Sequence, residues 1–135
     1  TLTEGPHDDW GHTARSLAGT FKEVLARGWI IWLDDDNELF SEGLSAALAS
    51  VSEETDVILA DVLLSDGMVV PGRSEPALGN LDGLGLIART RVLADVPWPT
   101  GAYEGDWHWY EALVGAGKKI ERRHIVVGRH GTTHP

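Results

Sequence analysis

The stretch Trp29–Phe40, W-I-I-W-L-D-D-D-N-E-L-F, decides the expected fold, because five large apolar residues run directly into three carboxylates. An unbroken apolar run rich in β-branched and aromatic residues is typical of a strand that is buried on both faces. Asp34, Asp35 and Asp36 would then lie at the carboxyl end of that strand. In open α/β sheets, ligands bind at the carboxyl ends of the strands.

The three aspartates are candidate metal ligands. Adjacent carboxylates repel each other, so a fold that gathers them usually holds a cation there. Carboxylate oxygens suit Mg²⁺ or Mn²⁺, and Mg²⁺ is commonly held by one or two carboxylates together with substrate phosphates. The alternative is a solvated acidic turn after a core strand, and the run alone favours neither interpretation.

On both sides of this stretch, apolar periodicity predicts helices that alternate with strands. Helices are expected over residues 13–27, from Ser41 as N-cap to about Val51, and over 107–116, with a helical turn at Val92 and Leu93. Strands are expected over 29–33, 56–64, 84–90 and 119–128, with 68–70 as a hairpin partner. Residues 71–83 are rich in Gly and Pro and are expected to form a mobile loop or lid. This alternation predicts one α/β domain, residues 1–135, with a mostly parallel sheet.

Composition limits the possible functions. Asp and Glu total 21 against 11 Lys and Arg, and the net charge of −10 argues against a nucleic-acid partner, which needs a basic face. No apolar stretch reaches the about 18 residues of a membrane span. The absence of cysteine fits a cytoplasmic location, and no signal peptide is visible. The chain begins at Thr1 rather than Met, which suggests a piece of a longer protein.

Two further segments place polar side chains at the ends of expected elements. Arg15 lies in the first turn of the first helix, where a cation gains nothing from the helix dipole. Glu104 and Asp106 precede the helix over 107–116, and Asp106 is well placed as its N-cap. Beside a metal-binding triplet, a separate carboxylate can instead serve as a general base.

These segments, in this order, resemble glycosyltransferase family 2, which has the GT-A fold. The family shows an apolar strand ending in D-x-D, and later an acidic residue before a tryptophan that opens a helix ending in A-G. Here the matching segments are W-I-I-W-L-D-D-D at 29–36 and E-G-D-W-H-W-Y-E-A-L-V-G-A-G-K-K-I at 104–120. G-H-T-A-R-S-L-A at 11–18 resembles the family's A-R-N stretch, and L-G-L-I-A-R-T-R-V-L at 84–93 resembles its acceptor-side strand.

The resemblance implies a metal-dependent, inverting transfer of a sugar from a nucleotide-sugar donor to a hydroxyl of a carbohydrate or other acceptor. It implies that Asp34 and Asp36 hold Mn²⁺ or Mg²⁺ against the donor diphosphate. Arg15, Asp34 and Asp35 are the expected donor contacts, and Asp106 is the expected general base.

The chain also departs from the family pattern. Gly105 stands where the family usually has Glu directly before the catalytic Asp, so Glu104 is the second candidate for the base. His130 matches a late metal-binding histidine of some relatives, although a solvated tail histidine is the preferred interpretation. The family's first strands have no counterpart here, so the resemblance covers only the central and C-terminal part. A further chain segment or an oligomer would then complete the fold.

Two other functions stay open at this point. One is a non-catalytic carbohydrate-binding or assembly module that keeps the fold but has lost half of the donor site. The other is a different Mg²⁺-dependent enzyme that handles phosphates with carboxylates at a strand end. The sequence does not distinguish these from a glycosyltransferase.

Overall fold

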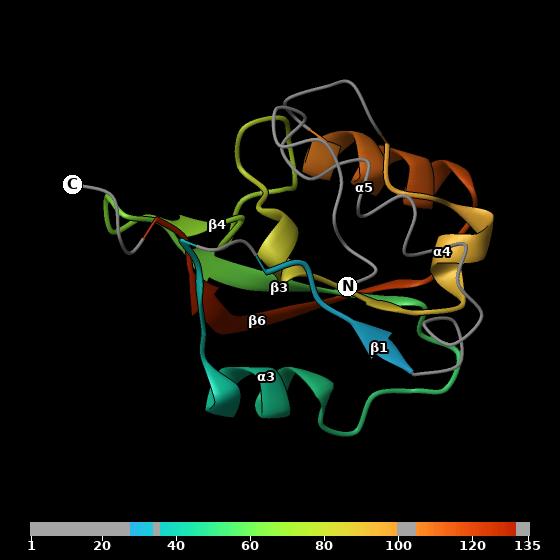
Figure 1. The fold of residues 1–135 in the computed structure, drawn as a ribbon, viewed down its shortest axis with the longest axis horizontal. Helices are drawn as coiled ribbons and strands as arrows, with labels where there is room; N and C mark the ends of the chain where they lie inside the picture. Colours follow the sequence, from blue (N-terminus) through green and yellow to red (C-terminus); the bar gives the residue numbers. More distant parts are fainter. Residues whose placement is uncertain (1–27, 34–35, 100–104, 132–135) are drawn as a thin grey trace.

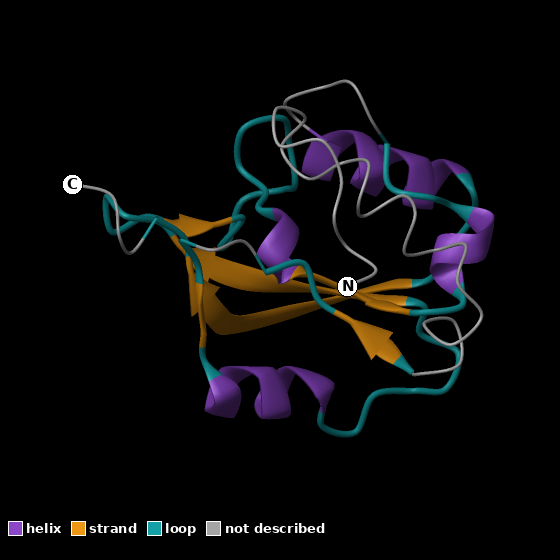
Figure 2. Cartoon of the chain, viewed as in Figure 1, coloured by secondary structure: helices purple, strands orange, loops and turns teal. Residues whose placement is uncertain are grey.

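The structure is a computed structural model that describes residues 28–33, 36–99 and 105–131 (Figure 1). These residues form a mixed α/β arrangement around one curled sheet (Figure 2). Within them the sheet has the strand order β1-β5-β3-β6-β2. The short strand β4 is not part of this order and pairs with the end of β3. The strands are β1 Trp29–Ile30, β2 Glu38–Leu39, β3 Val57–Leu63, β4 Val69–Val70, β5 Leu86–Arg89 and β6 Ile120–Arg129.

Helices cover the two faces of the sheet. Helix α3 (Ser41–Leu48) lies on one face, and α4 (Val92–Asp95) and α5 (Gly105–Gly115) lie on the other (Figure 1). A 3₁₀ turn, η1 (Gly83–Gly85), leads directly into β5. None of the helices described is long and apolar enough to cross a membrane.

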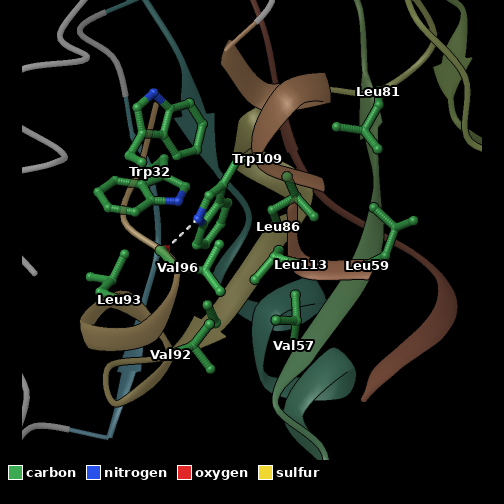
Figure 3. Close-up of a cluster of buried hydrophobic side chains, with 12 residues drawn as sticks. Trp32, Val57, Leu59, Leu81, Leu86, Val92, Leu93, Val96, Trp109 and Leu113 are labelled. Atoms are coloured by element: carbon green, nitrogen blue, oxygen red, sulfur yellow. Dashed lines mark hydrogen bonds between the residues drawn. The ribbon is translucent and has the colours of Figure 1, made fainter. Parts of the chain in front are cut away.

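Strand β3 is the centre of the sheet and of the core. Successive side chains of a strand point to opposite faces, so a strand covered on both sides must be apolar throughout. Ile58, Ala60 and Val62 pack in the cluster beneath α3. Val57 and Leu59 pack in the other cluster, together with Trp109 and Leu113 of α5 (Figure 3). The indole nitrogen Nε1 of Trp109 donates a hydrogen bond of 2.8 Å to the carbonyl oxygen of Val96.

In the stretch 29–33 only β1, Trp29–Ile30, is a strand, and it lies at the end of the described strand order. Its side chains and the next two still alternate between the two cores, because Ile30 and Trp32 pack on the α5 side and Trp29 and Ile31 pack on the α3 side. Within the described residues β1 pairs only with β5, so it has a neighbouring strand on one side. Trp32 is 5% exposed and packs against Trp98, with ring centroids 5.0 Å apart, whereas Leu33 is 54% exposed. The prediction of a strand is confirmed for Trp29 and Ile30, and packing on both faces is confirmed in part, but β3 rather than β1 is the central strand.

The prediction of an α/β fold is confirmed, and the prediction of a mostly parallel sheet is wrong. In the described sheet β3 and β6 are parallel, while β1–β5, β2–β6, β3–β4 and β3–β5 are antiparallel. Parallel neighbours need a crossover connection, usually a helix. Between β3 and β5 the chain makes a short hairpin, a loop and a 3₁₀ turn, so it re-enters the sheet from the edge that it left. Helix α5 carries it back across before β6.

Most other predicted elements are confirmed with shifts of a few residues. The strands over 56–64, 68–70, 84–90 and 119–128 correspond to β3, β4, β5 and β6, and the helix over 107–116 corresponds to α5. Helix α3 begins at Ser41, but Phe40 occupies its N-cap position and no side chain caps it. Strand β2 was not expected, because Glu38–Leu39 gains its partner only from β6. The helix expected over 13–27 lies outside the described residues.

Candidate functional site at the carboxyl edge of the sheet

Three strands end at the same edge of the sheet. Strands β1 and β3 are each antiparallel to β5, and β6 is parallel to β3, so β1, β3 and β6 run in one direction. Because β5 runs the opposite way, η1 precedes it at the edge where the other three end. Helix α5 also begins on this side (Figure 1). We call this the carboxyl edge, and Asp36, Asp82, Asp106 and His130 are among its polar residues.

Asp82 and His130 join η1 to the end of β6. Oδ1 of Asp82 accepts a hydrogen bond of 2.9 Å from the backbone N–H of Leu84, which caps η1. Oδ2 of Asp82 lies 3.0 Å from Nδ1 of His130. The backbone N–H of His130 donates to the carbonyl oxygen of Leu63 at 2.9 Å. His130 is therefore held at the end of β6, with its side chain still 41% exposed to solvent.

Asp106 is in the first turn of α5, packed against η1. Its Oδ1 accepts a hydrogen bond of 2.8 Å from the backbone N–H of Trp107. A Cβ at Gly83 would lie 3.6 Å from Cβ of Asp106 and 3.3 Å from the Trp98 ring, so glycine allows this close approach. The helix begins at Gly105, so Asp106 is a helical residue and its prediction as the N-cap is wrong. It lies beside Gly83, the neighbour of Asp82 in the chain.

Asp36 is the one member of the acidic triplet that the structure describes. It is half-buried and lies two residues before Glu38, the first residue of β2. Glu38 pairs with Arg129 in the sheet, and its Oε1 accepts a hydrogen bond of 3.0 Å from Nη2 of Arg129. Asp36 thus belongs to the edge where β6 ends. The other predicted site residues, Arg15, Asp34, Asp35 and Glu104, lie outside the described residues.

The described residues do not by themselves assemble a metal centre. Within residues 28–33, 36–99 and 105–131, no three His, Asp or Glu side chains gather into a group that could hold a metal ion. The carboxylate at 36 is a donor that Mn²⁺ and Mg²⁺ accept. Asp34, its predicted partner, belongs to the part of the chain that the structure does not describe.

One ion pair with shifted pKa values lies far from this edge, at the start of β6. Oε2 of Glu54 accepts a hydrogen bond of 2.8 Å from Nζ of Lys119. This hydrogen bond lowers the pKa of Glu54 and raises the pKa of Lys119. Both groups are at the surface, where an ion pair contributes little to stability, and the pair lies at the opposite end of the strands from the carboxyl edge.

Sequence reasoning missed Asp82, since N-L-D-G reads as an ordinary turn. It also missed Asp61, although a carboxylate inside the apolar run V-I-L-A-D-V-L is a detectable signal. No protein-family model, curated protein or solved structure matches this chain.

Proposed function

We propose that this chain is a glycosyltransferase domain that transfers a sugar from a nucleotide-sugar donor to an acceptor hydroxyl, with Asp106 as the general base. The observation that carries the proposal is the position of Asp106 in the first turn of α5, packed against η1 at the carboxyl edge. Ligands of open α/β sheets bind at this kind of edge. The type of reaction, transfer of a sugar, is proposed from the sequence motifs that resemble glycosyltransferase family 2.

The chain's own residues suit a proton acceptor at this place. Partial positive charge at a helix N-terminus favours a carboxylate over a neutral carboxyl group by about 0.3–1 kcal/mol. The hydrogen bond from Trp107 fixes the carboxylate, so it does not swing freely. Asp106 takes the proton of the acceptor hydroxyl while that oxygen bonds to the anomeric carbon and the bond from this carbon to the diphosphate oxygen breaks.

The proposed reaction also requires a divalent metal ion. Asp34 and Asp36 would hold Mn²⁺ or Mg²⁺, whose charge stabilises the departing nucleoside diphosphate. Arg15 and Asp35 are the proposed donor contacts.

Metal binding by Asp36 is the first test. We expect uridine or guanosine diphosphate to raise the Mn²⁺ affinity of the chain by about tenfold or more in calorimetry, because phosphate oxygens complete the ligand set. Asp36→Asn should abolish this gain. Glu53→Gln is the matched control, since it also removes one negative charge but from an exposed residue before β3. Equal behaviour of Asp36→Asn and Glu53→Gln would remove Asp36 from the donor site.

A further inference from the structure

A second polar site, made of other residues than those named at the carboxyl edge, lies between β3, β6 and the loop after β4. A pocket of about 780 Å³ is lined here, among the described residues, by Asp61, Val69, Gly72, Arg73 and His124. The loop after β4 rises on the same side of the sheet as α5 (Figure 1). Small-molecule sites typically have volumes of about 300–1,000 Å³, so the pocket has room for a sugar ring.

Asp61 presents one oxygen to this pocket. The residue is 5% exposed and lies in the central strand β3. Its Oδ1 accepts hydrogen bonds from Nη2 of Arg122 at 2.6 Å and from the backbone N–H of Gly72 at 3.1 Å. Its Oδ2 lies 4.0 Å from Nδ1 of His124, beyond hydrogen-bond distance. Within the described part of the chain no hydrogen bond reaches Oδ2, so this oxygen is available at the pocket that Asp61 lines.

Arg122 neutralises Asp61, and both of its terminal nitrogens, Nη1 and Nη2, donate to groups of the protein. Its Nη1 donates to the carbonyl oxygens of Leu59 at 2.8 Å and Arg123 at 3.1 Å, and its Nη2 also donates to Gly72 at 2.5 Å. The β3–β6 register shifts at this point, from Leu59 opposite Arg122 to Asp61 opposite Val126. This irregularity in β6 brings His124 to the pocket. Irregularities of this kind re-aim side chains next to binding sites.

Arg73 gives the pocket a net positive charge. Asp61 and Arg122 offset each other, and among the described residues Arg73 forms no ion pair. Arg73 is exposed at the rim. In a chain with a net charge of −10, a pocket whose uncompensated charge is positive selects for an anionic ligand group. Arginine binds carboxylate and phosphate with paired hydrogen bonds.

We propose that this pocket binds an acidic sugar, meaning a sugar that carries a carboxylate or a phosphate. A ligand hydroxyl donates to Oδ2 of Asp61, and the guanidinium of Arg73 holds the acidic group. A hydroxyl fits Oδ2 better than an ammonium group, because Arg122 already supplies a positive charge to Asp61 and protonated His124 would add another. The site is independent of the transfer reaction and needs no metal.

The test uses the full chain with four probes and without donor or metal, so it is separate from any test of transfer. Calorimetry compares glucuronate, glucose 6-phosphate, glucose and inorganic phosphate. We expect at least one acidic sugar to bind with a Kd of about 1 mM or tighter, and about tenfold tighter than glucose or phosphate alone. The stronger of the two acidic sugars identifies carboxylate or phosphate as the preferred group.

Arg73→Gln should remove this tenfold preference without changing the melting temperature, because Arg73 is exposed. Arg91→Gln is the control, since Arg91 is also exposed but hydrogen-bonds to Glu53 and Asp56 before β3. Carbon-13 NMR of the unmodified chain gives a second readout, in which the more tightly bound acidic sugar should shift the Asp61 carboxyl resonance but not that of Asp95. The proposal is overturned if no acidic sugar binds, if none binds more tightly than glucose, or if Arg73→Gln binds as the wild type does.

Discussion

Arg122 ties the central strand to the loop that follows β4. Its guanidinium donates to the carboxylate of Asp61 and to the carbonyl oxygens of Leu59, Arg123 and Gly72. The side chain of Asp61 is 7% exposed and that of Arg122 is 24% exposed, so the pair is shielded from solvent. Removing one member of a buried pair leaves an uncompensated charge, which costs more than the pair itself contributes.

Arg122→Gln should lower the free energy of unfolding by about 2–4 kcal/mol, toward the lower end of the range for broken buried pairs because Arg122 is partly exposed. Urea unfolding measures this. Arg129→Gln is the control, because the side chain of Arg129 is 46% exposed in its pair with Glu38. This substitution should lower the free energy of unfolding by about 1 kcal/mol or less. If the two variants lose the same amount, Arg122 is an ordinary surface cation.

Among the elements, α3 is fixed to β6 through a glycine. A Cβ at Gly43 would lie 2.1 Å from the carbonyl oxygen of Val126, a backbone atom that cannot move aside. The sequence alone makes Gly43 look like a weak point inside a helix, because glycine lowers helix propensity. The contact with β6 is a tertiary feature that local periodicity does not encode.

Gly43→Ala should destabilise the fold by about 1–3 kcal/mol, because overpacking outweighs the gain in helix propensity of about 1 kcal/mol. Gly115→Ala, at the end of α5, has nothing within 4 Å of the new methyl group and should be neutral or stabilising by up to about 1 kcal/mol. Thermal unfolding of both variants compares them directly. An increase in stability for Gly43→Ala would show that α3 does not approach β6 this closely.

The sequence predicted which segments are helices and strands better than it predicted where each strand lies in the sheet. The apolar run of β3 and the helical spacing in α5 were read correctly, because each pattern matches the local geometry. The outer position of β1 depends on which strands reach it, and no local pattern specifies that. In the loop 71–83, Asn80 hydrogen-bonds to Ala77 and Glu75, which gives this segment internal support. Its closure over a ligand stays a prediction.

At the scale of the whole molecule, the candidate site arises from strand direction. The rule that ligands bind at the carboxyl ends of strands predicted a site at the end of the strand that carries the aspartate triplet. In the structure Asp36 lies near the end of β6, and Asp106 lies beside Gly83 of η1. Asp82 and His130 meet there because β5 enters antiparallel and places η1 beside the end of β6. The sequence could not show that meeting, since it depends on the path of the chain between distant residues.

Substitution of Asp106 tests the central claim most directly. The full chain is incubated with nucleotide sugars, Mn²⁺ or Mg²⁺ and hydroxyl acceptors, and release of nucleoside diphosphate is measured. The wild type should turn over, and Asp106→Asn should be slower by about 10²-fold or more, because an amide cannot take the proton. Its melting temperature should stay the same, since the Asn oxygen can still accept the hydrogen bond from Trp107. A wild type without turnover, or an Asp106→Asn variant that keeps the wild-type rate, would contradict the account, and the second result would make Glu104 the next candidate for the base.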